Sequence, residues 1–212
     1  MSVTTAARKK ARTPPRPARG TPEETRARLV AAAADVFERD GYHGTDSNAL
    51  ARAAGYSPGT FYKHFVDKRA LFLAVYEAWV GATWKSVESA LVAEHPSPDV
   101  AAKRIVTALL VSHERWAGFR RSLKLLAATD DAVRAAFLDN RRRQLAGFER
   151  LRAGRPSSPN RAREEDALLM FTLERACDAI ADGEADGLGV TRSGLIAQLV
   201  SLVRAHLGAP PG

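Results

Sequence analysis

The stretch from Thr45 to Lys68 constrains the fold of this 212-residue chain more than any other, because it contains two helix starts separated by a sharp turn. Asp46 is a typical N-cap for a first short helix. Ser57-Pro58 opens a second short helix, with serine as the N-cap and proline at the first helical position. Ala54-Gly55-Tyr56 between them forms a tight turn. The pattern therefore predicts a helix-turn-helix at about residues 45–64.

Apolar residues recur at helical spacing along the rest of the chain, and no segment alternates between apolar and polar residues as a strand does. Thr21-Pro22-Glu23-Glu24 has the pattern of a capping box at the start of a helix that runs to about Arg39. Asp67 is placed to cap a longer helix that follows the turn region. We therefore expect an all-α fold, with a three-helix domain over residues 21–68 and a helical domain over residues 69–212.

The composition excludes several classes of protein. A single cysteine, Cys177, rules out an internal disulfide framework and a cysteine zinc site, and it indicates a reducing compartment. No apolar run approaches the roughly 18 residues that a membrane span needs, and the N-terminus lacks the apolar core of a secretory signal. We expect a cytoplasmic protein with no membrane segment, no metal and no cofactor.

Positive charge is concentrated near the N-terminus. Residues 1–70 contain 13 Lys and Arg against 7 Asp and Glu, whereas residues 71–212 contain 19 against 17. The first 20 residues include prolines and no acid, and their basic residues are Arg8, Lys9, Lys10, Arg12, Arg16 and Arg19. We expect residues 1–20 to be a disordered basic arm. Such an arm is either an ordinary solvated tail or a segment that follows DNA phosphates.

The second helix of the predicted helix-turn-helix carries the chemistry of a nucleic-acid contact. In such motifs this helix can lie in the major groove of DNA. Gly59 lets the backbone come close to a partner, while Phe61 pins the helix to its neighbour. Hydroxyl, aromatic and cationic donors follow within about two helical turns, as in helices that meet phosphates and base edges. They are Ser57, Thr60, Tyr62, Lys63, His64 and Lys68.

The same stretch resembles the TetR/AcrR family of transcriptional regulators, from Thr25 to about Phe72. The pattern AG-x-S-x-GT-x-Y-x-HF-x-x-K, highly specific to that family, is met from Ala54 to Lys68. The resemblance implies a head that binds operator DNA as one half of a homodimer. It also implies a helical C-terminal domain that binds a small molecule and dimerises.

The resemblance also implies which residues touch DNA. Those facing the phosphate backbone would be Thr45, Thr60, Tyr62, His64 and Lys68, and those nearest the base edges would be Asn48, Ser57, Pro58, Gly59 and Lys63. Two positions depart from the family pattern. Ser47 replaces a usually apolar residue, and Asn48 stands where arginine is common, so adenine is a better match there than guanine.

These observations together predict a sequence-specific repressor that a small-molecule effector releases from its operator. The alternative is a transcriptional activator or a DNA-binding protein that needs no ligand. An enzyme is not expected, because no nucleophile–base pair or phosphate loop has a recognisable spacing. The expected partners are double-stranded operator DNA, an apolar or amphipathic effector and a second copy of the chain. Two apolar helices predicted at about 164–181 and 191–207 suit pairing with that copy.

The effector site is predicted from aromatic and sulfur-containing residues, although each of them is also what an ordinary helical core contains. His113 and Glu174 lie among apolar residues and either orient a polar group of the ligand or are solvated or paired internally. Arg141 to Arg143 form a solvated helix face or serve an acidic effector or partner. The residues expected to line the cavity are Trp79, Trp84, Trp116, Phe119, Phe137, Phe148, Met170 and Phe171.

Overall fold

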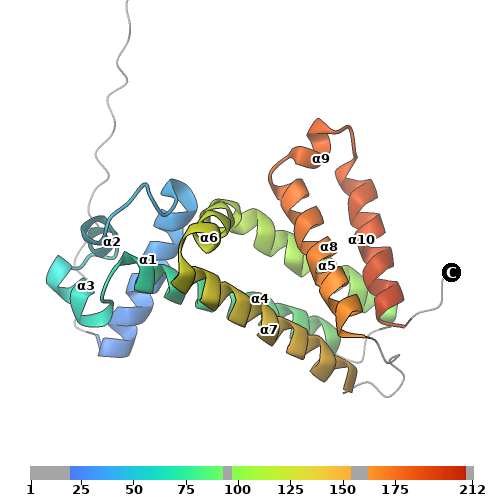
Figure 1. The fold of residues 1–212 in the computed structure, drawn as a ribbon, viewed down its shortest axis with the longest axis horizontal. Helices are drawn as coiled ribbons and strands as arrows, with labels where there is room; N and C mark the ends of the chain where they lie inside the picture. Colours follow the sequence, from blue (N-terminus) through green and yellow to red (C-terminus); the bar gives the residue numbers. More distant parts are fainter. Residues whose placement is uncertain (1–19, 93–96, 154–161, 209–212) are drawn as a thin grey trace, which may run out of the picture. The chain divides into compact units, whose positions relative to one another are not determined.

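The computed structural model describes residues 20–92, 97–153 and 162–208 of the chain (Figure 1). Within these ranges every regular element is an α-helix, which confirms the all-α prediction. The chain divides into two compact units between Phe72 and Leu73, inside one helix. The sequence had placed this boundary between residues 68 and 69.

The first unit contains three helices and the start of a fourth. They are α1 (Pro22–Asp40), α2 (Ser47–Ala53), α3 (Pro58–His64) and the first residues of α4 (Lys68–Val92). The predicted capping box is present at α1, since Glu24 N donates to Thr21 Oγ1 at 3.2 Å and Thr21 N donates to Glu24 Oε2 at 3.1 Å. Fully buried apolar side chains from all four helices form the core, among them Leu29, Phe37, Leu50, Phe61 and Phe72.

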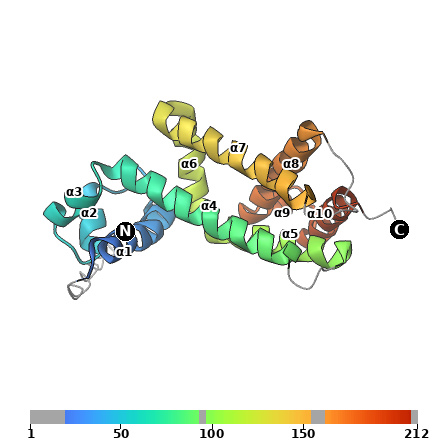
Figure 2. The same ribbon diagram turned by 90° about the horizontal axis from the view of Figure 1, so that it is seen from below.

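The second unit contains the rest of α4 and six further helices in the described residues. They are α5 (Pro98–Arg115), α6 (Ala117–Thr129), α7 (Asp131–Ala153), α8 (Arg163–Ala181), α9 (Glu184–Gly187) and α10 (Arg192–His206). Helix α5 packs against α8 and α10, and α6 packs against α7. Helix α7 runs beside α4 (Figure 2). Between these two helices Phe137 stacks on Tyr76, and Phe148 meets Trp84 edge to face.

The two apolar helices predicted near the end of the chain correspond to α8 and α10. Between them, the segment from Asp182 contains the single-turn helix α9, which begins after Gly183 at a φ of 74°. Most of the basic arm predicted at residues 1–20 lies outside the described residues. In the part of the chain that is described, no helix combines the length and apolar character needed to cross a membrane.

Candidate nucleic-acid interface

Short-range hydrogen bonds build the helix-turn-helix of α2 and α3. Asp46 Oδ1 accepts from Ala49 N at 2.8 Å, and Ser57 Oγ accepts from Thr60 N at 3.2 Å, so both predicted N-caps are confirmed. Gly55 in the turn has a φ of 77°, a conformation that residues with a Cβ rarely adopt. These local signals fix where α3 begins and the direction in which it leaves the turn.

Helix α3 is anchored on one side and exposed on the other. Phe61 is fully buried and Phe65 nearly so, and the guanidinium of Arg26 lies 5.0 Å from the centre of the Phe65 ring. Tyr62, by contrast, is 55% exposed, and Lys63 next to it is exposed as well. The helix therefore presents polar and aromatic groups outward from a firm apolar base.

The ten predicted DNA-contacting residues differ in accessibility. Asn48 on α2 and the group Ser57, Pro58, Gly59, Tyr62 and Lys63 on or beside α3 are exposed. Thr45, Thr60, His64 and Lys68 are half-buried. The hydroxyl oxygen of Thr45 is buried and has no hydrogen-bond partner among the described residues.

The ammonium of Lys68 is engaged within the first unit. Its Nζ donates to the backbone oxygen of Tyr42 at 2.9 Å and to that of Thr45 at 2.8 Å, and it lies 4.1 Å from the centre of the Tyr42 ring. Burial lowers the pKa of Lys68 from its ordinary value. Two of the three N–H groups of the ammonium thus hold the segment between α1 and α2, and the phosphate contact expected for the side chain stays a prediction.

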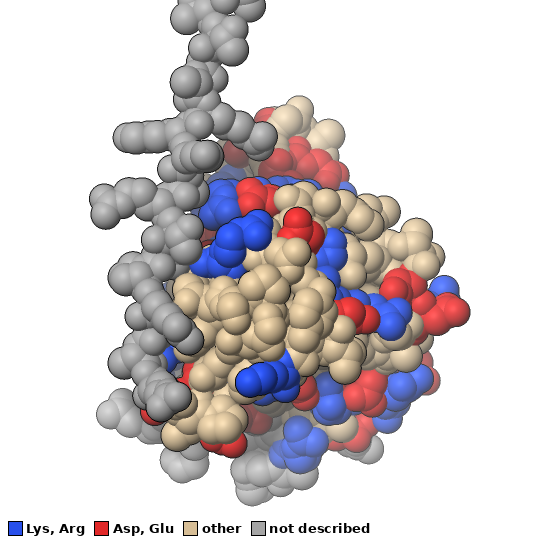
Figure 3. All heavy atoms as spheres, turned by 90° about the vertical axis from the view of Figure 1, so that its left-hand side faces the viewer, with Lys and Arg blue, Asp and Glu red and all other residues tan. Residues whose placement is uncertain are grey.

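The described part of the first unit has no excess charge. Residues 20–72 contain seven Lys and Arg and seven Asp and Glu, so the surplus near the N-terminus comes from residues 1–19. Seen from the side of α2 and α3, the surface is mainly uncharged, with basic and acidic groups interspersed (Figure 3). Residues 20–72 therefore add no net charge to the attraction that a polyanion would experience, and the surplus positive charge of this part of the sequence lies before α1.

Comparison with known proteins agrees with this geometry. Residues 29–75 match the family model described as "Bacterial regulatory proteins, tetR family". The HTH-type transcriptional repressor AcnR of Corynebacterium efficiens is 26% identical over 193 residues, which cover 89% of this chain and 95% of AcnR. The helix-turn-helix of this chain is of the TetR-family type. That family and its named relatives are transcriptional regulators and not enzymes.

Other TetR-family similarities are local or structural. The HTH-type transcriptional regulator UidR of Escherichia coli K12 is 38% identical over 53 residues, so the match spans only about a quarter of each chain, 25% of this one and 27% of UidR. A crystal structure of a putative TetR-family regulator from Mesorhizobium loti superposes with a TM-score of 0.69 at 23% identity. It covers 89% of this chain and 98% of that one. At this low sequence identity, the likeness to the Mesorhizobium loti structure shows the fold alone.

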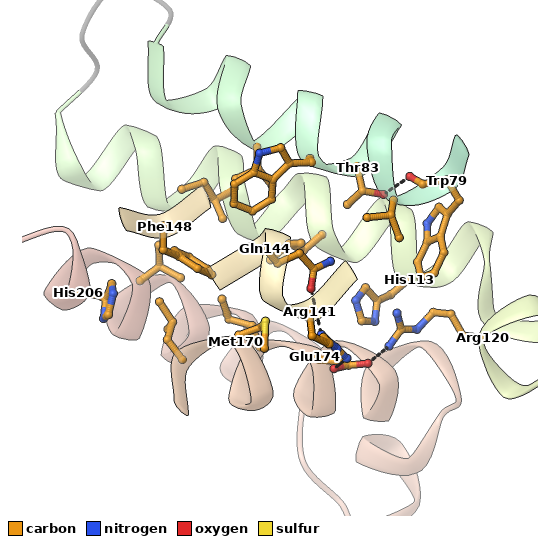
Figure 4. A pocket seen from close by; sticks show the side chains of 18 of the residues that line it. Trp79, Thr83, His113, Arg120, Arg141, Gln144, Phe148, Met170, Glu174 and His206 are labelled. Carbon is orange, nitrogen blue, oxygen red and sulfur yellow. Dashed lines mark hydrogen bonds and ion pairs between the residues drawn. The ribbon is translucent and has the colours of Figure 1, made fainter. Parts of the chain in front are cut away.

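The second unit contains a partly open cavity of about 130 Å³ between α4, α5, α7, α8 and α10 (Figure 4). Its walls are mostly apolar, with Val87, Leu109 and Leu169 among them. At one end a group of polar side chains reaches the lumen, and it includes Arg120 from α6. At the other end His206 lies edge to face against Phe148, and its Nε2 is 2.8 Å from Asp166 Oδ1.

Buried ion pairs organise the polar end. Arg120 donates from Nε to Asp178 Oδ1 at 2.8 Å and from Nη2 to Glu174 Oε1 at 2.8 Å, and Arg141 pairs with the second oxygen of Glu174. Lys124 also donates to Asp178. Burial favours a raised pKa for Asp178, but the hydrogen bonds from His113, Arg120 and Lys124 outweigh it and hold the pKa well below its ordinary range.

The protonation of His113 follows from this arrangement. Burial is the largest influence on His113 and lowers the pKa of its ring from the ordinary value, so the ring is neutral at pH 7. Its Nδ1 lies 2.9 Å from Oδ1 of the ionised Asp178, which can only accept. Nδ1 therefore carries the proton and Nε2 is left as an acceptor.

Four of the eight predicted effector residues line the cavity, and the other four lie elsewhere in the second unit. Trp79, Trp84, Phe148 and Met170 line the cavity. The other four, Trp116, Phe119, Phe137 and Phe171, do not line it. Phe119 is fully buried against Trp79 and Trp116, Phe137 lies between Tyr76 and Arg141, and Phe171 is 56% exposed on α8.

Sequence reasoning missed four polar residues of the cavity wall, Thr83, Arg120, Gln144 and His206, and it offered Arg141 only as part of the run from Arg141 to Arg143. A signal for Arg141 and Gln144 was present on α7. Arg141 and Gln144 follow Phe137 by four and seven residues and precede Phe148 by seven and four, so all four share one helix face. The neighbouring Arg142 lies off that face and is exposed.

Proposed function

We propose that this chain is a sequence-specific DNA-binding repressor that acts in the cytoplasm as a homodimer and is released from its operator by a small molecule bound in the cavity. The observation that carries the proposal is the construction of α3. Phe61 is fully buried while Tyr62 and Lys63 are exposed beside a glycine, so the helix offers a polar surface on a rigid apolar base.

Base reading is assigned to the exposed residues. Asn48 at the start of α2 suits a bidentate contact with adenine, and Lys63 suits guanine or a phosphate. Gly59 permits close approach of the backbone, and Tyr62 is placed to donate to a phosphate. Because residues 20–72 have balanced charges, the basic residues before α1 supply most of the electrostatic attraction in this proposal.

The exposed apolar surface of the second unit supports dimerisation. Leu168 and Phe171 on α8 are 67% and 56% exposed, and Leu202 on α10 is 40% exposed. Large apolar side chains exposed on two helices are favourably buried against the same surface of a second copy. Such a dimer would present two α3 helices to major grooves about 34 Å apart, or a related distance, on a pseudo-palindromic site.

The sign of regulation is proposed from a sequence match that extends through both units. AcnR, named as a repressor, aligns along 89% of this chain and therefore through both units. A match over most of the second unit supports a shared mode of action better than a match of the DNA-binding helices alone.

Selection of bound DNA from a random pool tests the proposal. We expect enrichment of a pseudo-palindrome whose half-sites are spaced by about one helical turn. Asn48→Ala should relax base preference at one position of each half-site, while Ser86→Ala, exposed on α4 in the second unit, should leave the selected site unchanged. Binding without sequence preference would contradict the assignment of base contacts.

Transcription in vitro from a promoter containing the selected site then tests the sign. Added protein should lower transcript yield, whereas a rise would assign activation. Sedimentation of the free protein at micromolar concentration should give the mass of a dimer. Leu202→Glu should shift that mass toward monomer, because it places a charge in the proposed interface.

A further inference from the structure

The cavity has room for a short apolar chain or a single ring. An apolar cavity of about 150 Å³ holds a benzene molecule, so about 130 Å³ holds roughly six non-hydrogen atoms, and because the cavity is partly open a longer chain can extend out of it. Trp84, Val87, Leu109, Phe148 and Leu169 surround the apolar part. A short hydrocarbon chain or a single ring would gain contacts with these walls without displacing them.

The polar end has more donors than acceptors. Gln144 Oε1 accepts from Arg141 Nη1 at 3.3 Å, and because arginine has no acceptor the amide oxygen must face it. The Gln144 NH2 group is thereby left for a ligand. Arg120 uses Nε and Nη2 for Asp178 and Glu174, and its Nη1 has no partner among the residues that the structure describes.

The nearby acceptors are already occupied. Each oxygen of Glu174 receives a different guanidinium, and both oxygens of Asp178 receive cationic donors. With His113 neutral, this cluster contains three cations, Arg120, Lys124 and Arg141, and only two carboxylates. The cluster therefore leaves one unused acceptor, Nε2 of His113, but several unused N–H groups, those of the Gln144 amide and of Arg120 Nη1.

We infer that the cavity selects a small amphipathic carboxylate, with its hydrocarbon part beside Trp84 and Phe148 and its carboxylate on the N–H groups of Gln144, Arg120 and Arg141. Two planar guanidinium groups and an amide can meet both oxygens of a carboxylate. The inference rests on the proposed function only in taking this cavity as the effector site. Figure 4 shows the labelled Gln144, Arg141, Arg120 and Glu174 at one end and Phe148 toward the other.

Binding of three probes that each contain eight carbon atoms tests the head group. Octanoate, 1-octanol and octylamine are titrated into the full-length protein without DNA, by calorimetry and by the fluorescence of Trp79 and Trp84, which line the cavity. We expect octanoate to bind at least about tenfold more tightly than either of the others, as charge-assisted hydrogen bonds would give. Equal affinities, or a preference for the amine, would overturn the inference.

Variants on α7 locate the carboxylate. Arg141→Met should abolish the preference of octanoate over octanol, and Arg142→Met, one residue along and exposed, should retain it. Because Arg141 also pairs with Glu174, Gln144→Leu is the second test: it removes the amide donor and leaves both ion pairs of Glu174 in place. Octanoate affinity should fall several-fold in Gln144→Leu. A preference that survives in both folded variants would refute the assignment.

The same titrations separate this inference from the proposed function. Failure of the wild-type protein to bind any selected DNA would refute the regulator and would leave the octanoate result standing. Conversely, sequence-specific DNA binding together with equal affinity for the three probes would refute only the ligand class.

Discussion

Lys63 and Lys68 lie on adjoining helices of the first unit, and the structure gives their ammonium groups different roles. Lys63 is exposed on α3, whereas Lys68 at the start of α4 donates to two backbone oxygens and lies against the Tyr42 ring. Replacing Lys68 by methionine keeps most of the chain length but leaves those oxygens without their donor. A hydrogen bond to a charged group contributes about 1.5–3 kcal/mol, and the cation–π contact about 0.5–1 kcal/mol.

Part of this stabilisation is offset, because burial of the ammonium is unfavourable and lowers its pKa. We therefore expect Lys68→Met to lower the free energy of unfolding by about 1.5–3 kcal/mol, measured by denaturant titration. Lys63→Met should change it by less than about 0.5 kcal/mol, since the side chain is exposed.

The salt dependence of DNA affinity distinguishes the two lysines in the bound state. Each phosphate neutralised by a lysine contributes about 0.9 to the slope of log K against log salt concentration. Lys63→Met should reduce that slope by about 0.9, whereas Lys68→Met should weaken binding with the slope unchanged. Lys103→Met, exposed on α5, serves as the control. A slope reduced by Lys68→Met with full stability would show that its ammonium turns to a phosphate, and would refute the structural role.

Three further substitutions have expected outcomes. In Gly59→Ala the new Cβ would meet only Ser57 Oγ, at 3.9 Å, so thermal unfolding should show a stability that is unchanged or raised by up to about 1 kcal/mol. The DNA affinity of this variant should fall tenfold or more if the backbone at Gly59 approaches DNA. An unchanged DNA affinity would exclude that approach. In Gly147→Ala the Cβ would overlap the Trp84 ring, so we expect a loss of about 1–3 kcal/mol in stability and weaker octanoate binding by calorimetry. Asp178→Asn should cost about 3–5 kcal/mol at pH 7, because it leaves buried cations without their partner. The pKa of Asp178 is depressed in the folded state, so its carboxylate contributes to stability above about pH 4, and this contribution is lost progressively below that pH. The difference in the free energy of unfolding between the wild-type protein and Asp178→Asn, measured by urea titration, should therefore become smaller as the pH falls below about 4.

Features that depend on neighbouring residues were predictable from the sequence. The caps at Thr21, Asp46 and Ser57 each join residues three positions apart, so the residue types alone determine them. The polar end of the cavity was not predictable, because Arg120 meets Glu174 and Asp178 across 54 and 58 positions of sequence. Only the packing of α6 and α7 beside α8 brings those groups together.

Lys68 shows a second limit of the sequence. A lysine after a helix-turn-helix has the chemistry of a phosphate contact, and that chemistry is equally suited to two carbonyl oxygens at the end of a loop. Aromatic residues pose the same difficulty in the second unit. Phe119 and Phe148 have the same size and both follow apolar stripes, yet Phe119 is fully buried in the core and Phe148 lines the cavity.

Release of DNA by a ligand requires that the ligand prefer the state with low affinity for DNA, and the coupling must be reciprocal. If octanoate lowers operator affinity by a given factor, the operator must lower octanoate affinity by the same factor. Helix α4 carries Lys68, which holds the loop before α2, as well as Trp79 and Trp84 of the cavity wall, so one helix contributes to both sites. Calorimetry of octanoate with free protein and with the operator complex measures this directly. Equal affinities in the two titrations would mean that the cavity, whatever it binds, does not regulate the DNA-binding unit.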